Sequence, residues 1–223
     1  MSAKLRVAWA EIGNELLEFL RKRAGGGESF SANAGLDLSG VVVTAAMKQW
    51  HTLRTLELIF QDVQSNQLNS RFETKWKEYQ RRARWAEATL FNTGVGLVDE
   101  PIPRAEAPTL AVIAGATPGD SYLVQVAWTN SKGENGTPSF AASITVPTTG
   151  AIGVSTGGTP EGVTGFHVYA GGSSSAVTRQ TSVPVAIGEQ WVMPAEGLTA
   201  GAAPGEGQHP DWWLRNDRVL QRG

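Results

Sequence analysis

The side chains that most often carry out chemistry in proteins are few in this chain and far apart. Its three histidines, His51, His167 and His209, fall in different segments, and the chain has no cysteine. Protein zinc sites draw His and Cys ligands at short spacings, and none of the three histidines has such a neighbour. We therefore expect the histidines to be structural, and we expect no bound metal or cofactor.

Other motifs of catalysis are incomplete. The segment Gly115–Gly119 lacks the lysine and the spacing of a phosphate-binding loop. Glu11, Glu15 and Glu18 can share one side of a helix, and a solvated surface explains them better than an acid–base pair. The sequence therefore predicts a protein that is not an enzyme.

The elements that hold these residues change in character close to residue 100. Residues 1–91 contain 13 Lys and Arg against 10 Asp and Glu, and residues 92–223 contain 6 against 11, so the net charges are +3 and −5. The first 24 residues lack the unbroken apolar core of a signal peptide. No segment reaches the ~18–20 apolar residues of a membrane span, so we expect no membrane partner.

Residues 1–98 are predicted to form an α-helical bundle of three helices. A first helix ends at Gly25–Gly27, because three glycines hold a helix poorly. Its predicted buried stripe contains Leu5, Trp9, Ile12, Leu16, Phe19 and Leu20. A second helix opens near Asp37 or Ser39, although Val41–Val43 also fits a short strand.

The third predicted helix has the clearest pattern. Six apolar residues step along it by 4, 3, 4, 3 and 4, which places them on one face: Phe72, Trp76, Tyr79, Ala83, Ala86 and Leu90. The stop is predicted at Asn92–Gly94. A Pro-rich linker, residues 99–107, follows the bundle.

Residues 108–200 are predicted to form a β-sandwich, which makes the chain α+β in separate domains. Three runs alternate apolar residues with the period of a strand, and they contain Tyr122, Val124, Val126 and Trp128, then Phe140, Ala142, Ile144 and Val146, then Phe166, Val168 and Ala170. His167 and Tyr169 fall on the opposite face of the third run. Weaker strands are expected near 110–113, 176–181, 183–187 and 190–193.

Residues 201–223 are predicted to form a linker and an anchoring tail. The apolar residues of the tail are Trp212, Trp213, Leu214, Val219 and Leu220. Tryptophan and arginine are typical anchors of protein interfaces, because they bury a large area and keep a polar handle. Two interpretations remain open: the tail folds back onto its own chain, or it docks onto another subunit.

The third helix also carries a basic side. Its members are Arg71, Lys75, Lys77, Arg81, Arg82 and Arg84. Pairs such as Glu73–Lys77 and Glu78–Arg82 favour a solvated, internally paired surface. Contact with an acidic subunit or with passing DNA is the alternative, and no groove-reading motif predicts sequence-specific DNA binding.

The order of helix, glycine loop, long helix and the segment KWKEYQRRARWAEATLF resembles the head-to-tail adaptor (connector) proteins of tailed double-stranded DNA phages. The resemblance covers about residues 1–98 and includes Trp76, Tyr79 and Trp85. It implies a ring of about 12 copies beneath the portal protein, next to tail or nozzle proteins and around genomic DNA. In that family the C-terminal segment docks on the portal, a role that would fall on Trp212, Trp213, Leu214, Val219 and Leu220.

The second half is similar to fibronectin type III or Ig-like domains. The similarity rests on the segment Asp120–Asn130, on Gly136–Ser139 and on Val163–Ala170, and it covers about residues 108–196. Such domains often decorate phage structural proteins, whereas a typical adaptor lacks one.

Together these resemblances imply a structural virion protein of the phage neck, a head-to-tail adaptor assembled in the host cytoplasm. The alternative is a tail fibre, baseplate or other neck component whose Ig-like domain binds a surface or a carbohydrate. In that case Trp128, Tyr169 and Trp191 would be the candidates for stacking on sugar rings.

Overall fold

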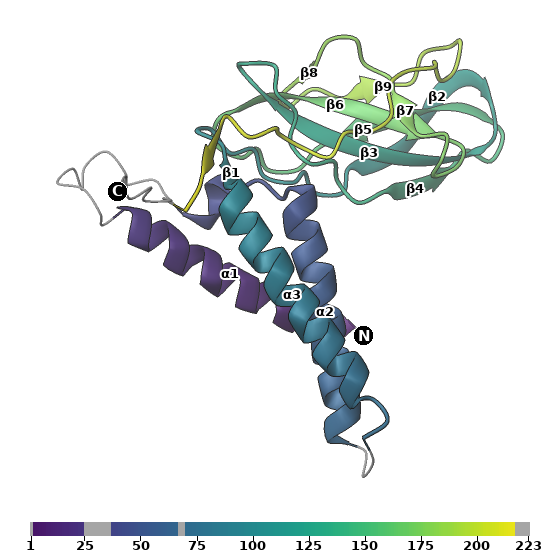
Figure 1. Cartoon of the computed structure of the whole chain (residues 1–223). Coiled ribbons are helices and arrows are strands. Elements are labelled where there is room, and N and C mark those ends of the chain that lie inside the picture. Colours follow the sequence, from purple (N-terminus) through teal and green to yellow (C-terminus); the bar gives the residue numbers. More distant parts are fainter. Residues whose placement is uncertain (1, 25–36, 67–69, 217–223) are drawn as a thin grey trace. The chain divides into compact units, whose positions relative to one another are not determined.

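The computed structural model describes residues 2–24, 37–66 and 70–216 (Figure 1). It divides the chain into two compact units. Met1–Asp99 and His209–Gly223 form a helical unit, and Glu100–Gln208 form a β unit. The β unit is therefore inserted between two segments of the helical unit.

Three long helices make up most of the helical unit. They are α1 (Ser2–Ala24), α2 (Ala45–Ser65) and α3 (Glu73–Thr93), and one 3-10 turn, η1 (Leu38–Gly40), precedes α2. Consecutive helices α2 and α3 run side by side, and α1 crosses them at an angle (Figure 1). The helices expected from the apolar spacing are thus present.

The ends of these helices follow from local chemistry. Asp37 caps η1 rather than a long helix, and α2 begins later, where the Thr44 hydroxyl accepts the Met47 N–H. Gly94 ends α3 with a φ of 120°, a conformation that glycine adopts without steric cost.

The helical unit has one hydrophobic core. Its buried side chains are Ile12, Leu16, Phe19, Leu20, Met47, Trp50, Leu53, Ala83, Ala86, Leu90, Val95 and Leu97. The predicted stripe of α3 is confirmed, since Ala83, Ala86 and Leu90 are buried and Phe72, Trp76 and Tyr79 are half-buried. All three helices therefore contribute a face to the same core.

The predicted stripe of α1 is wrong in its first two turns. Leu5 and Trp9 are 37% and 46% exposed, whereas Ile12 and Leu16 are buried as expected. At this end α1 meets α2 through His51, whose Nε2 lies 2.9 Å from the Leu5 carbonyl oxygen. The Trp9 ring meets the His51 ring edge-on, at 5.4 Å between centroids.

Two three-residue strands join distant parts of the helical unit. β1 (Val95–Leu97) pairs antiparallel with β10 (Trp212–Leu214), and Gly96 lies opposite Trp213. On its other edge Leu97 forms a bridge with Val41. The strand alternative for Val41 is thus correct for that residue, and β1 lies between two partners.

The β unit contains two antiparallel sheets. One has the order β2-β5-β9, with bounds Thr109–Pro118, Thr149–Ser155 and Trp191–Val192. The other has the order β4-β3-β6-β7, with bounds Ala142–Thr145, Ser121–Asn130, Val163–Gly171 and Thr178–Arg179. The two-residue strand β8 (Val185–Ala186) also pairs with β6.

Both sheets contribute to one core. Its buried members are Ala105, Tyr122, Val124, Val126, Trp128, Val146, Ala151, Ile152, Val154, Phe166, Val168, Ala170 and Met193. The predicted alternation in β3 and β6 is therefore confirmed for the core face. Antiparallel sheets following a helical half confirm the α+β arrangement.

Three details of the β unit differ from expectation. The far face of β3 is also covered, because Ala127, Tyr169 and Val177 form a second small cluster. Phe140 lies before β4 and is 72% exposed, with the Arg104 guanidinium 4.8 Å from its ring centroid. β5 was not expected at all, since its segment is rich in glycine and threonine.

Within the residues that the structure describes, no helix combines the length and apolar composition needed to cross a membrane.

Candidate functional site

The C-terminal tail lies against the helical unit of its own chain. Leu214 packs on the core, while Trp212 and Trp213 are 37% and 47% exposed. Gly96 makes this close approach possible, because a Cβ there would come within 2.5 Å of Pro210 Cγ. Of the two interpretations of the tail, folding back onto its own chain therefore describes residues 212–216. Val219 and Leu220 lie outside the described residues.

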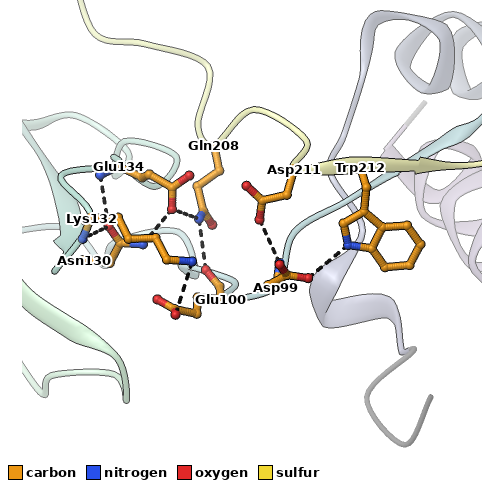
Figure 2. A network of polar contacts seen from close by, with 8 residues as sticks. All are labelled: Asp99, Glu100, Asn130, Lys132, Glu134, Gln208, Asp211 and Trp212. Atoms are coloured by element: carbon orange, nitrogen blue, oxygen red, sulfur yellow. Dashed lines mark hydrogen bonds and ion pairs between the residues drawn. The ribbon is translucent and has the colours of Figure 1, made fainter. Parts of the chain in front are cut away.

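A short polar network holds the tail beside the end of β1 (Figure 2). The Trp212 indole N–H donates to Asp99 Oδ1 over 3.0 Å, and the Asp99 N–H donates to Asp211 Oδ2 over 2.9 Å. The Asp211 N–H donates to the Leu97 carbonyl over 2.9 Å. Hydrogen bonding to the helical unit thus orients the indole of Trp212. Trp213 has the larger exposed fraction of the two tryptophans.

A second network ties together the two ends of the β unit (Figure 2). Gln208 accepts the Ile102 N–H over 2.6 Å and donates to the Glu100 carbonyl over 2.9 Å and to Glu134 Oε2 over 3.2 Å. Lys132 forms an ion pair with Glu100 at 3.2 Å. The chain therefore enters and leaves the β unit at one place.

Three of the six basic residues predicted on the third helix, Lys75, Lys77 and Arg82, form ion pairs within α3. Lys75 and Arg82 both bind Glu78, at 2.8 and 3.5 Å, and Lys77 binds Glu73. The Arg71 guanidinium lies 5.4 Å from the Phe72 ring centroid. The pairing expected for Glu73–Lys77 and Glu78–Arg82 is confirmed.

Arg81 and Arg84 are the exception. Both are exposed, and within the described part of the chain neither has an ion-pair partner within 4.0 Å. Trp85 follows them and is 57% exposed. Two arginines without an ion pair among the described residues, and an exposed indole, therefore lie on the solvent side of α3.

The histidines belong to different segments of the chain, His167 to the β unit and His51 to the helical unit. His167 is buried in the β unit with Nδ1 2.8 Å from Thr181 Oγ1, and burial, with a contribution from Arg179, lowers its pKa to about 4. His51 contacts the Leu5 carbonyl in the helical unit. Among residues 2–24, 37–66 and 70–216, no three His, Asp or Glu side chains are grouped in a way that could hold a metal ion.

A glycine and serine spacing typical of serine hydrolases is present at the end of β5. Gly153–Gly157 matches the spacing G-x-S-x-G of serine hydrolases. That motif needs a sharp turn from a strand into a helix, but Ser155 ends β5 and lies opposite Thr109 in an antiparallel sheet. The motif therefore lacks the geometry of a nucleophile elbow.

A groove of about 440 Å³ is present in the β unit, lined by residues 179–182 and 199–202. Its polar groups are engaged with the protein: Arg179 donates to the Thr181 and Ser182 carbonyls, and Gln180 both donates to and accepts from Thr199. These bonds join the segment after β9 to β7 and to the residues that follow it. The polar groups of the groove thus stabilise the fold.

A charged cluster within the helical unit was also missed. Arg54 of α2 binds Glu11 of α1 and the buried Glu57, each at 2.7 Å. Glu15 of α1 lies near Glu87 of α3, and the pKa of Glu15 is raised to about 6 by burial first and by the negative charge of Glu87 second. The predicted solvated surface holds for Glu18 but is wrong for Glu11 and Glu15, which are half-buried.

A comparison of the chain with protein-family models and with curated protein sequences gives no match.

Proposed function

We propose that the chain is a structural virion protein of a tailed phage, a ring-forming adaptor that joins the portal to the tail around the DNA exit channel. The observation that carries the proposal is the C-terminal strand β10. It belongs to the helical unit and holds Trp212 and Trp213 at the surface. A tryptophan fixed on a strand loses little entropy on binding, which suits an anchor.

The inserted β unit supports this proposal as a decorating domain. We assign it a fibronectin type III or Ig-like fold, because the order β4-β3-β6-β7 matches strands C′-C-F-G and the pair β2-β5 matches B-E. Trp128 of β3 is buried edge-on against Phe166 of β6, as expected for the core tryptophan of strand C. The strand β9 beside β5 is a departure from that pattern.

The proposal is tested by mixing the full chain with the portal protein of the same virus and imaging the mixture by negative-stain electron microscopy. We expect rings of about 12 copies seated on the portal. Images in which the portal remains bare at micromolar concentrations of the chain would contradict it.

The anchor itself needs a substitution rather than a truncation. Removing residues 209–223 deletes β10 and uncovers Val95 and Leu97 of the core. A loss of portal binding by that truncation could therefore result from unfolding of the helical unit rather than from loss of the anchor. Trp213→Ala should weaken portal binding by at least tenfold, while Trp9→Ala, which removes an indole of nearly the same exposure, should leave it unchanged.

The second candidate, a surface- or carbohydrate-binding component, keeps one supporting observation. Trp128 and Tyr169 are buried, so neither ring is open to a sugar, whereas Trp191 is half-buried against the core. Phe140, 72% exposed beside Arg104, is the aromatic side chain that could take their place. Glycan-array binding by the full chain that is lost in Phe140→Ala would favour this candidate.

A further inference from the structure

The exposed side of α3 carries a compact cationic and aromatic surface. Successive residues of an α-helix are about 100° apart, which places Arg81, Arg84 and Trp85 opposite the core positions Ala83, Ala86 and Leu90. Trp85 is the most exposed large apolar side chain described in the helical unit, at 57%. We call Arg81, Arg84 and Trp85 the arginine–tryptophan face.

The charges of this face are available to a partner. The neighbouring cations Lys75, Lys77 and Arg82 are engaged by Glu73 or Glu78 on the same helix. Arg81 and Arg84 make no such pair in the described part of the chain. Tryptophan and arginine together are the residue types that dominate binding energy at protein interfaces, so an acidic and partly apolar partner would fit here.

A surface with those properties occurs in the β unit. The segment between β7 and the end of β9 exposes three apolar side chains: Val183 is 72%, Ile187 37% and Val192 47% exposed. Glu189 is the single charged residue between positions 180 and 195, and it is exposed. We call residues 183–192 the β8–β9 segment.

The β8–β9 segment is held in a fixed shape. Val185 and Ala186 pair with β6, and Trp191 and Val192 pair with β5, so the segment is tied to both sheets. Between them the Glu189 N–H donates to the Ala186 carbonyl over 3.1 Å, and Gly188 takes a φ of 83°. A preformed turn pays little ordering entropy on binding.

We propose that the arginine–tryptophan face of one copy binds the β8–β9 segment of a second copy. Charge complementarity supports this occupant: the helical unit carries 16 Lys and Arg against 13 Asp and Glu, and the β unit carries 3 against 8. A contact between two different surfaces of the same chain is heterologous and can close into a ring. The inference rests on the proposed ring assembly and names the contact that would build it.

Site-specific cross-linking tests the contact directly. Trp85 of the full chain is replaced by the photoreactive residue p-benzoylphenylalanine, and the protein is mixed with an equal amount of ¹⁵N-labelled unmodified chain before irradiation. Peptides that combine both isotopes then report links between copies. We expect such links to map to residues 183–192. Links to other segments, or none at millimolar concentration, overturn the inference.

A charge exchange provides the quantitative test. Arg84→Glu and Glu189→Arg should each weaken self-association by about tenfold in sedimentation equilibrium, and the double variant should recover most of the loss. Arg6→Glu makes the same charge change at an exposed site of α1 and should have no such effect. Additive losses in the double variant would contradict the pairing. If rings form on the portal while both of these tests fail, the proposed contact is rejected and the adaptor proposal still stands.

Discussion

At the scale of single residues, the helical unit contains a carboxyl group whose ionised form is destabilised by its surroundings. Glu15 lies beside Glu87, with Arg54 and Glu11 as its other charged neighbours, and its pKa is raised to about 6. A raised pKa means that the folded chain binds the proton more tightly than the unfolded chain. The stabilising contribution is therefore complete below pH 4.5 and is lost as the pH rises through about 6.

Glu15→Gln should accordingly stabilise the protein at pH 8 and change little at pH 4. A full shift of this size corresponds to ~2 kcal/mol, and we expect about 1 kcal/mol because Glu15 is only partly buried. Thermal unfolding of both proteins from pH 4 to pH 8 measures the difference.

Glu18→Gln is the matched control. Glu18 lies one turn further along α1, where hydrogen bonding to Lys22 lowers its pKa. Its substitution should not stabilise the protein at any pH in the range. Parallel stability curves for wild type and Glu15→Gln would show that the carboxyl pair is not coupled to folding.

A second residue-scale prediction concerns Gly96. Its absent side chain leaves room for Pro210, whose Cγ lies 2.5 Å from the position of a Cβ. Gly96→Ala should push residues 210–214 away from β1, at a cost of about 1–3 kcal/mol. Trypsin should then cleave after Arg215 faster than in the wild type. Gly158→Ala, where a Cβ meets nothing within 4 Å, is the control, and equal cleavage rates would contradict the prediction.

At the scale of elements, helices with a complete apolar period were predictable. The stripe of α3 was predictable from Phe72 to Leu90, because each of its six members is buried or half-buried. Leu5 and Trp9 continue the apolar period of α1 but remain exposed, because a periodic pattern carries no information about what packs against it. The paired basic residues of α3 were predictable for the same reason as its stripe, since i,i+4 spacing is local.

The elements that escaped prediction depend on distant partners. β1 and β10 have three residues each, which is too few to show a period. They form a sheet because Gly96 pairs with Trp213, and the whole β unit lies between these two residues in the sequence. β5 has Ile152 and Val154 among small residues, and its pairing with β2 decides its structure. The cluster of Glu11, Glu15, Arg54 and Glu87 draws on three helices, so no single segment of sequence contains it.

At the scale of the whole molecule, the chain is one unit inserted into another. One hydrogen bond joins Glu100 and Gln208, and another joins Asp99 and Asp211. Each unit also has a hydrophobic core of its own, as expected of a domain that can fold alone.

The isolated segment 100–208 should fold without the helices. We expect a cooperative thermal transition and a near-ultraviolet circular dichroism signal from the buried Trp128. Gln208→Ala in the same fragment should lower the transition temperature, because its bonds to Ile102 and Glu100 close the unit. A fragment without a cooperative transition would contradict independence.

The pairing of β1 with β10 also means that the helical unit can be completed only late in the synthesis of the chain. The ribosome completes all three helices and β1 early, but it delivers the partner strand only after the whole β unit has been made. At about 5–20 residues per second, this delay lasts on the order of 5 to 20 seconds. During that interval one edge of β1 has no partner, so the nascent helical unit is exposed to chaperones and to wrong pairing until β10 has been made.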